Sequence, residues 1–452
     1  MKKLAPGAAL ALALLGAAEA HADEDLSAQI EAANKAIRSL EGRIQTLEAE
    51  KAKAAAPAAP PPPAAGTAPA ELGAVVVAPK ALPQAGAPDA GKARLEIYGF
   101  AQLDIIQDVK GVDPDWTGTL RSSKIPVACP ADPGCGKIGE TTFSIRGSRL
   151  GVKGFIPTAV GELKTQFEFD LFGLGRDAGK TTFHLAKAWA ELGPVLVGQI
   201  YTLFMDVDVF PNTFNYWGPI GMTYLGNPQL RVTPFNRGGI KLAVALEEPA
   251  TRVDSSSKGF AGVSEMNRFP DLTVQFRLER DWGHLQAAGM LRLLGYHAPG
   301  VATGSPSGTL PGSGASVGAG IKTVGKDQIL VQLNGGVGIS NYINDFDCCS
   351  DVATDAAGRA RAVPLVGWML YYDHAWSDRW GSAVGWSGIY QSSTSGQGPS
   401  TFKLGQYASA NLLFYPAKNV KTGFEVIYAS RENQSHAYAD DTRFQLSAKC
   451  GF

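Results

Sequence analysis

The chain has 452 residues, with 41 Lys and Arg against 42 Asp and Glu, 53 glycines and only 6 methionines. Mean hydropathy is close to zero, and beyond the N-terminal segment no uninterrupted apolar run reaches membrane-spanning length. This excludes a helical membrane protein and leaves a soluble protein or a barrel, whose strands turn one face to lipid and one to water. The nearly balanced charge neither requires nor excludes a charged pore.

Residues 1–22 have the form of a secretory signal peptide. Lys2 and Lys3 precede an apolar stretch from Leu4 to Ala17, and small-x-small cleavage sites follow it. A transmembrane anchor is the alternative, but it needs about 20 apolar residues and Glu19 interrupts the run too early. We expect export and cleavage after Ala22.

Residues 23–53 are predicted to form a periplasmic coiled coil, and residues 54–93 an Ala- and Pro-rich semi-rigid linker. A lone surface helix is the alternative to the coil, but a helix of this length is marginal in water without a partner. Side-chain preferences at the core positions of the heptads, taken alone, favour a coiled coil of two helices. The apolar residues recur in steps of four and three at Leu26, Ile30, Ala33, Ile37, Leu40, Ile44 and Leu47.

Residues 94–452 are predicted to form a sixteen-stranded antiparallel transmembrane β-barrel, because apolar and polar side chains alternate in sixteen segments. The final segment ends on Phe452, which resembles the assembly signal of outer-membrane barrels. The segments are Arg94–Asp108, Thr141–Gly154, Gly161–Leu171, Thr182–Leu192, Val195–Phe204, Pro228–Pro234, Gly239–Glu247, Leu272–Arg280, His284–Tyr296, Ser316–Thr323, Gln328–Tyr342, Val363–Trp376, Trp380–Gln391, Phe402–Tyr415, Val420–Ser430 and Thr442–Phe452.

The connections between these segments alternate in length. Short turns such as Gly193-Pro194 alternate with long polar stretches at 109–140, 205–227, 249–271, 298–315 and 344–362. Short turns on one rim and long loops on the other is the plan of outer-membrane barrels, and it puts both barrel ends and the coil in the periplasm.

The long connection after the fifth segment is the most distinctive stretch, since it is rich in aromatic residues and Pro turns. We expect it to fold into the lumen and narrow it. An external loop whose aromatics pack at the rim or at a subunit contact is the alternative. The candidate constriction residues are Asp206, Asp208, Phe210, Asn212, Tyr216 and Trp217.

Several motifs together resemble the DcaP-like outer-membrane porins, a family associated with dicarboxylate uptake. They are the heptads, the Pro/Ala linker, Tyr98-Gly99-Phe100, the segment from Ser148 to Gly154, and the run from Gly198 to Phe204 with its Pro-Asn-Thr and Tyr-Trp-Gly-Pro continuation. The resemblance implies a sixteen-stranded trimeric channel for small anions. A trimeric barrel would hold three helices at high effective concentration, so we favour a homotrimer over the two-stranded coil.

Charged side chains on the predicted lumen face are the candidate selectivity residues. Basic residues slightly outnumber acidic ones there, and fixed cations select anions by replacing lost hydration. Paired wall charges that fix the barrel's shape are the alternative for any single residue. The residues chosen as pore-lining are Arg146, Lys164, Arg231, Arg277, Arg292 and Arg443; Lys153, Lys187, Lys241, Lys322, Lys421 and Lys449 share their face, opposed by Glu96, Asp104, Glu162, Glu168, Asp170, Glu191, Glu279 and Glu425.

Five cysteines and six histidines raise the question of other chemistry. Cys129 and Cys135 bracket a turn and are predicted to form a local disulfide, whereas Cys348 and Cys349 pair elsewhere or remain free. Neither cysteine pair has an accompanying histidine, and no nucleophile motif adjoins any histidine. We therefore expect no metal, no cofactor, no nucleic-acid partner and no enzyme activity.

The sequence thus favours an outer-membrane channel for small hydrophilic, anionic solutes. A general non-selective porin is the first alternative. The second is a barrel whose added role is contact with the cell wall through the coil.

Overall fold

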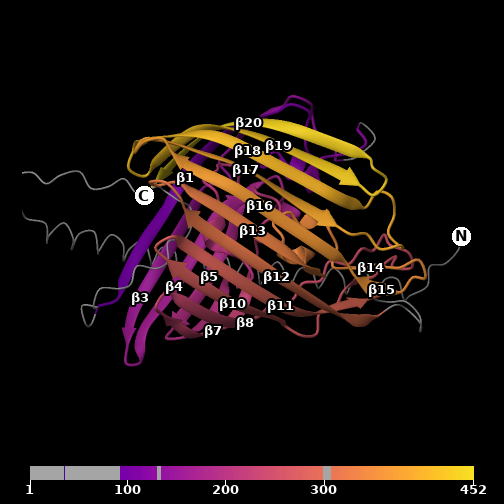
Figure 1. Cartoon of the computed structure of the whole chain (residues 1–452), viewed down its shortest axis with the longest axis horizontal. Helices are drawn as coiled ribbons and strands as arrows, with labels where there is room; N and C mark the ends of the chain where they lie inside the picture. Colours follow the sequence, from indigo (N-terminus) through magenta and orange to yellow (C-terminus); the bar gives the residue numbers. More distant parts are fainter. Residues whose placement is uncertain (1–34, 36–91, 130–133, 299–306) are drawn as a thin grey trace, which may run out of the picture. The chain divides into compact units, whose positions relative to one another are not determined.

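The computed structural model describes residues 35, 92–129, 134–298 and 307–452, and these form a closed sixteen-stranded antiparallel barrel (Figure 1). The predicted fold class of the barrel is confirmed. Its strands are β1 Arg94–Asp108, β3 Arg149–Thr158, β4 Gly161–Phe172, β5 Thr181–Leu192, β6 Val195–Tyr201, β7 Gly226–Arg237, β8 Ile240–Glu247, β10 Asp271–Arg280, β11 Gly283–His297, β12 Gly308–Lys322, β13 Gln328–Val337, β16 Pro364–Ala375, β17 Trp380–Gln391, β18 Phe402–Ala417, β19 Val420–Asn433 and β20 Tyr438–Gly451.

Shorter elements extend these strands or lie in the loops. The strand β2 continues the line of β3 beside β1, β9 pairs with the end of β11, and β14 forms a hairpin with β15. Their bounds are β2 Thr141–Ser144, β9 Ser264–Glu265, β14 Val352–Thr354 and β15 Ala360–Ala362, and the 3-10 turns are η1 Pro114–Trp116, η2 Ser122–Lys124, η3 Gly175–Asp177, η4 Val207–Val209, η5 Ser340–Tyr342 and η6 Phe346–Cys348.

The barrel closes where β1 lies between β3 and β20. Phe100 of β1 is opposite Arg149 of β3, and Gln102 of β1 is opposite Lys449 of β20. Closure gives every wall strand a neighbour on each side, as a bilayer requires. The first and last strands are thus brought together at one place in the lumen.

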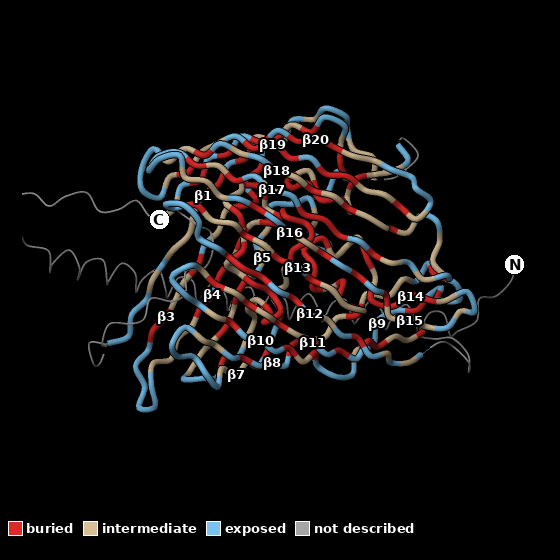
Figure 2. Tube along the Cα trace, viewed as in Figure 1, coloured by how far each residue is buried: buried red, intermediate tan, exposed pale blue. Residues whose placement is uncertain are grey.

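Alternation along each strand separates the two faces of the wall (Figure 2). On β20, Phe444 and Leu446 are 38% and 50% exposed, whereas Arg443 and Gln445, which alternate with them, are buried. Successive side chains point to opposite sides of a strand, so the apolar set faces outward and the polar set faces the lumen.

The connections form one rim of short turns and one rim of long loops. Four of the long connections carry the argument below. They are named L1 (residues 109–140), L3 (202–225), L4 (248–270) and L6 (338–363).

Most predicted segments differ from the strands by a few residues at one or both ends, and two differ in a way that matters for the packing. The segment Thr141–Gly154 is broken by turn and bend residues at 145–148 into β2 and β3. β12 begins at Gly308, inside the stretch predicted as a loop, because its glycines read as loop residues in the sequence. A Cβ at Gly314 would lie 2.8 Å from Ile339 and 3.3 Å from Phe204, so glycine there makes room for L3 and L6 to pack against the wall.

The signal peptide, the coil and nearly all of the linker lie outside the described residues, so their bounds remain predictions. Within the described ranges, no helix is long and apolar enough to span a membrane.

Candidate functional site in the barrel lumen

L3 lies inside the barrel and is fixed to opposite parts of its wall. The Asp206 carboxylate lies 3.1 Å from Arg277 on β10 and 2.9 Å from His284 on β11. On the other side, the backbone N–H of Phe214 donates to the Glu425 carboxylate on β19 at 2.9 Å. The loop therefore spans the lumen between these strands.

Further contacts hold the centre of L3. Lys421 on β19 donates to the Asn212 side chain at 2.9 Å and to the Thr213 carbonyl at 3.2 Å. The Tyr216 hydroxyl donates to Asp170 on β4 at 2.6 Å. With both ends and the centre bound to the wall, the loop is a fixed partition rather than a hanging flap.

Arg121 of L1 joins three long loops at one point. Its guanidinium is fully buried and lies 4.5 Å from the ring centroids of both Trp116 in L1 and Trp217 in L3. The same group pairs with Asp345 of L6 at 2.9 Å. A cation on an aromatic face is stabilised by the ring quadrupole, and the ion pair balances the buried charge.

Asp347 of L6 extends this cluster to a fourth loop. Its carboxylate lies 3.2 Å from Arg121, 3.0 Å from Lys124 and 3.1 Å from Arg252 of L4. Burial alone raises the pKa of this carboxyl, but the three cations outweigh burial and hold the pKa below its ordinary value. Asp347 therefore stays ionised and links L1, L4 and L6.

A cavity of about 460 Å³ lies on the other side of L3, between that loop and the wall strands around β1. Five cations and one carboxylate line it, together with aromatic rings from the wall and from L3. The cations are Arg149, Lys153, Lys187, Lys421 and Lys449, the carboxylate is Glu168, and the rings include Tyr98, Phe100, Tyr201, Phe210, Phe214 and Tyr216.

The Glu168 carboxylate contacts only two of the five cations that line the cavity. Glu168 lies 2.9 Å from Lys187 and 3.2 Å from Arg149, and it accepts a hydrogen bond of 2.7 Å from the Tyr98 hydroxyl. Lys153 and Lys449 instead lie over aromatic rings, those of Tyr98 and Phe100 respectively. The cavity is thus a positively charged, partly aromatic compartment.

Sequence comparison gives the family. The model of the DcaP outer membrane protein family matches residues 86–452. The chain belongs to this family. Its members are outer-membrane porins, so the predicted family, the outer-membrane location and the channel class are confirmed. No curated protein matches the chain.

Solved structures show the same fold for the family barrel. The outer membrane channel DcaP of Acinetobacter baumannii has 20% sequence identity and a TM-score of 0.69, over 81% of this chain and 99% of that one. An anion-selective porin from Comamonas acidovorans has 11% identity and a TM-score of 0.52, over 80% of this chain and 100% of that one. At these identities the likeness concerns the fold.

Three of the six predicted pore-lining residues are buried cations held by the wall or the loops. Arg443 makes a forked pair with Asp108 at 2.6 and 2.8 Å, and Arg292 lies 2.8 Å from Asp271. Arg146 donates to the Gly173 carbonyl. These three hold strands and loops together.

The other three predicted residues differ in how much charge they present to the lumen. Arg277 contacts Asp206, Asp208 and Glu279, so its charge is offset while it anchors L3. Lys164 pairs with Glu191 at 3.3 Å, with both side chains about one-third exposed. Arg231 donates to the Gln229 side chain and the Tyr201 carbonyl, which are neutral groups.

All six candidate constriction residues lie in L3, where some bind the barrel wall, one lines the cavity and two pack against other loops or rings. Asp206 and Asp208 bind Arg277, and Asn212 binds Lys421. Phe210 lines the cavity. Tyr216 stacks on Phe172 at 4.1 Å, while the Trp217 indole donates to the Asn344 carbonyl of L6 at 2.6 Å.

Arg149 lines the cavity although the sequence did not single it out as a site residue. The break at 145–148 separates β2, where Ser144 is buried, from β3, where Arg149 and Lys153 line the cavity, and the single strand predicted from Thr141 to Gly154 conceals that β3 begins at Arg149. The turn-prone Gly147-Ser148 pair is the signal that could have indicated the break.

The cysteines form two local bonds. Cys129 is bonded to Cys135, and Cys348 to its neighbour Cys349, a pairing that the sequence did not suggest, while Cys450 is a free, exposed thiol. Across the described part of the chain, no group of three or more His, Cys, Asp or Glu side chains is arranged to hold a metal ion. His184 faces Asp170 within the wall, and His284 of the wall faces Asp206 of L3.

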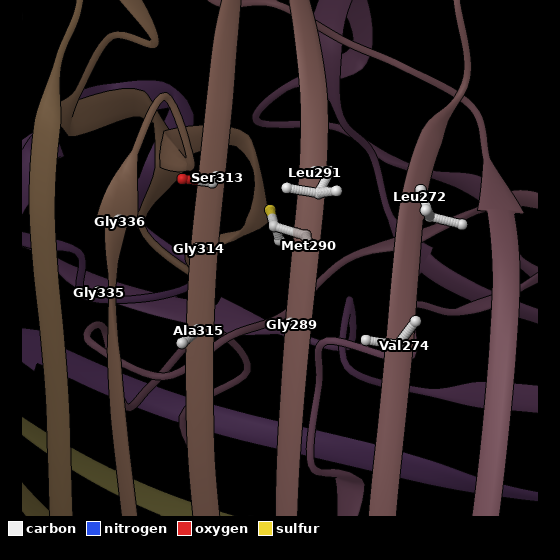
Figure 3. A pocket seen from close by; sticks show the side chains of 10 residues that line it. All are labelled: Leu272, Val274, Gly289, Met290, Leu291, Ser313, Gly314, Ala315, Gly335 and Gly336. Carbon is white, nitrogen blue, oxygen red and sulfur yellow. The ribbon is translucent and has the colours of Figure 1, made fainter.

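A second hollow, of about 480 Å³, lies in the wall at β10 to β13 (Figure 3). It is lined by small and apolar residues such as Gly289, Ala315 and Leu291. Leu291 is 62% exposed, as a lipid-facing side chain should be, so this groove belongs to the membrane face of the barrel. The charged cavity under L3 is the candidate site.

Proposed function

We infer that this DcaP family protein is an outer-membrane diffusion channel that prefers small anions, dicarboxylate-like ones among them, and that it assembles as a homotrimer. The observation that supports anion preference is the cavity under L3, where five cations meet one carboxylate. The lumen water beside L3 is confined between low-dielectric walls, where a fixed charge acts more strongly than in bulk water.

The chemistry of the lining favours carboxylates. Lysine ammonium groups supply three donors each and the Arg149 guanidinium supplies a planar fork, the two kinds of partner that carboxylate oxygens accept well. Aromatic rings beside these cations offer a surface for the hydrocarbon part of a small organic acid. Both features are compatible with passage without a covalent step.

The test is electrical. With purified protein in a planar bilayer, the zero-current potential is measured first across a potassium chloride gradient and then across a potassium succinate gradient, and each gives the permeability of that anion relative to potassium. We expect both anions to be more permeant than potassium, with succinate passing readily. A channel that prefers potassium, or one that ignores charge, would instead be a general porin.

The homotrimer is tested separately by mass measurement of the detergent-solubilised protein. The predicted contact of the N-terminal coil with the cell wall lies outside the described residues and remains a prediction.

A further inference from the structure

The disulfide bond between Cys348 and Cys349 in L6 joins two consecutive residues. A disulfide stabilises a fold mainly by closing a loop of the unfolded chain, and this effect shrinks as the loop becomes shorter. The Cys129–Cys135 bond has a sequence separation of 6, whereas the separation here is 1. The Cys348–Cys349 bond therefore restricts the unfolded chain very little, and its effect is confined to the local shape of L6.

The bond lies between two sets of anchors that hold L6 in place. On its N-terminal side, Asp347 pairs with cations of L1 and L4. On its C-terminal side, the Ser350 backbone N–H donates to the Gln391 side chain of β17 at 2.8 Å, and Asp351 lies 3.3 Å from Arg292 of β11. Because the bond fixes the backbone between these anchors, it helps L6 to reach the other loops and the wall at the same time.

The two cysteines differ in how easily a reagent reaches them. Cys349 is 6% exposed and belongs to the same apolar core as Leu120 of L1 and Ile343 of L6. Cys348 is half-buried and packs against that core. Both lie among the long loops, which form the extracellular rim in this class of barrel. A small reagent arriving from outside therefore meets Cys348 first.

Cations close to the bond favour its opening by a thiol. The Arg252 guanidinium donates to the Cys349 carbonyl at 3.3 Å. Arg252 and Arg121 also lie over the ring of Phe346, at 5.0 and 5.2 Å from its centroid. Positive charge stabilises a thiolate, and a disulfide is cleaved faster when the thiolate that leaves is more stable. When Cys348 is attacked, the leaving thiolate is that of Cys349.

The exchange consists of two balanced steps. The thiolate of a small thiol attacks the Cys348 sulfur and forms a mixed disulfide with it, while the bond to Cys349 breaks and its electron pair leaves on the Cys349 sulfur, which takes a proton from water. A second thiol attacks the sulfur of the attached small molecule, so that the oxidised disulfide of the reagent and the Cys348 thiol are released. Two thiols are oxidised, and the cysteine pair gains two electrons and two protons.

We propose that the Cys348–Cys349 bond is a thiol-exchange site on the rim of long loops, and that small thiols open it and loosen L6 from L1. Two separate thiols occupy more space than one disulfide, and Cys349 is enclosed by the apolar core, so L6 shifts when the bond opens. The shift draws Asp347 away from the cations of L1 and widens the passage beside L3. This inference goes beyond the proposed anion channel and does not depend on which ions the channel prefers.

The first test is chemical and uses the folded, full-length protein in detergent. The protein is incubated with reduced glutathione at pH 8, free thiols are blocked with N-ethylmaleimide, and fragment mass spectra assign the adducts. We expect glutathione on Cys348 about tenfold more often than on Cys349, because the more accessible sulfur is attacked. A bond that stays intact in the folded protein, at a dithiothreitol concentration that reduces it in the urea-unfolded protein, would overturn the proposal.

The second test records single channels of the full-length protein in potassium chloride while dithiothreitol is added to each side in turn. We expect the conductance to rise when the reagent reaches the long-loop side and to return to its starting value with oxidised glutathione. The double variant Cys348→Ser, Cys349→Ser should have the higher conductance from the start and ignore dithiothreitol. The matched control Cys129→Ser, Cys135→Ser removes the other disulfide and should respond as the wild type does.

Two electrical results would contradict the proposal. One is a wild-type conductance that does not change although mass spectrometry shows the Cys348–Cys349 bond reduced. The other is a response to dithiothreitol that persists in the double variant Cys348→Ser, Cys349→Ser. Heat-modified gel mobility reports whether this variant folds, and if it does not, the wild-type measurement alone decides.

Discussion

The two halves of the lumen use the same barrel wall in different ways. Toward the long loops, L1, L3 and L6 pack together around an apolar core that includes Leu120, Ile220 and Ile343, with Arg121 held among aromatic rings. Toward the short turns, the wall around β1 is lined by cations and encloses a cavity. The comparison teaches that loops occupy one half and restrict the passage, while strands carry the charge that a solute meets in the other half.

The largest expected effect comes from breaking the loop cluster at Arg121. The variant Arg121→Ala leaves Asp345 buried without its main cation, a loss of about 3–5 kcal/mol for a broken buried pair. We expect L1 and L6 to detach, giving larger single-channel conductance and rapid proteolysis in these loops. The matched control is Arg359→Ala, an exposed arginine of L6 whose carboxylate partner Asp355 lies on the same loop. Unchanged conductance and protease resistance in Arg121→Ala would contradict the role of the cluster.

A smaller effect separates free from neutralised arginines in the wall. The variant Arg231→Glu reverses a charge whose hydrogen-bond partners, the Gln229 side chain and the Tyr201 carbonyl, are neutral. We expect the anion-to-cation permeability ratio to fall at least about threefold, because two unit charges about 10 Å apart interact by about 0.4 kcal/mol even in bulk water and the reversal doubles this. The variant Arg277→Glu places a fourth acid beside Asp206, Asp208 and Glu279, so it should release L3 and raise conductance as well. Zero-current potentials and conductance measured together distinguish the two. Identical behaviour of both variants would show that this distinction is wrong.

The loop half should also resist mild acid. The pKa of Asp347 is lowered in the folded protein, so the stability from its ion pairs is fully present above the unfolded value of about 3.9 and is lost as the pH falls through the lower folded value. We expect the difference in conductance between the wild type and Asp347→Asn to be constant from pH 8 to about pH 5 and to disappear only below about pH 4. A loss of that difference near pH 6 would contradict this assignment.

The smallest effect is expected from the Cys129–Cys135 bond, which closes a short loop within L1. Replacing both residues by Ser removes a constraint worth roughly 2–3 kcal/mol on the unfolded chain. Neither cysteine is among the residues that line the cavity or pair with Arg121. We expect faster proteolysis of L1 with no change in conductance or selectivity. A changed selectivity would show that L1 influences the charged half.

The sequence predicted the wall better than the loops, for a physical reason. Alternation is a local property, so the inward parity of Arg443 and Lys449 could be derived from neighbouring residues alone. Arg149 was missed although Lys153, which has the same parity on β3, was placed on the lumen face, because the break at 145–148 conceals that β3 begins at Arg149. Arg121 was missed because its partner Asp345 is 224 positions away, and no local pattern indicates which loops will meet inside a barrel.

The choice among cations shows the same limit. Arg292 and Lys449 both fall on the lumen face, but Arg292 meets Asp271 of β10 and Asp351 of L6 while Lys449 meets the Phe100 ring of β1. Composition of the face predicts an excess of positive charge. Which members of the set remain unneutralised depends on contacts between residues far apart in the sequence.

The most direct test of the division between the two halves compares two variants in one measurement, the zero-current potential across a potassium chloride gradient together with the conductance. The double variant Lys153→Glu, Lys449→Glu should move the potential from the anion side toward the cation side with little change in conductance, since it alters charge and leaves the loops packed. Arg121→Ala should raise conductance and leave the sign of the potential unchanged. A wild-type channel that prefers cations, or a double variant with the wild-type potential, would contradict the account.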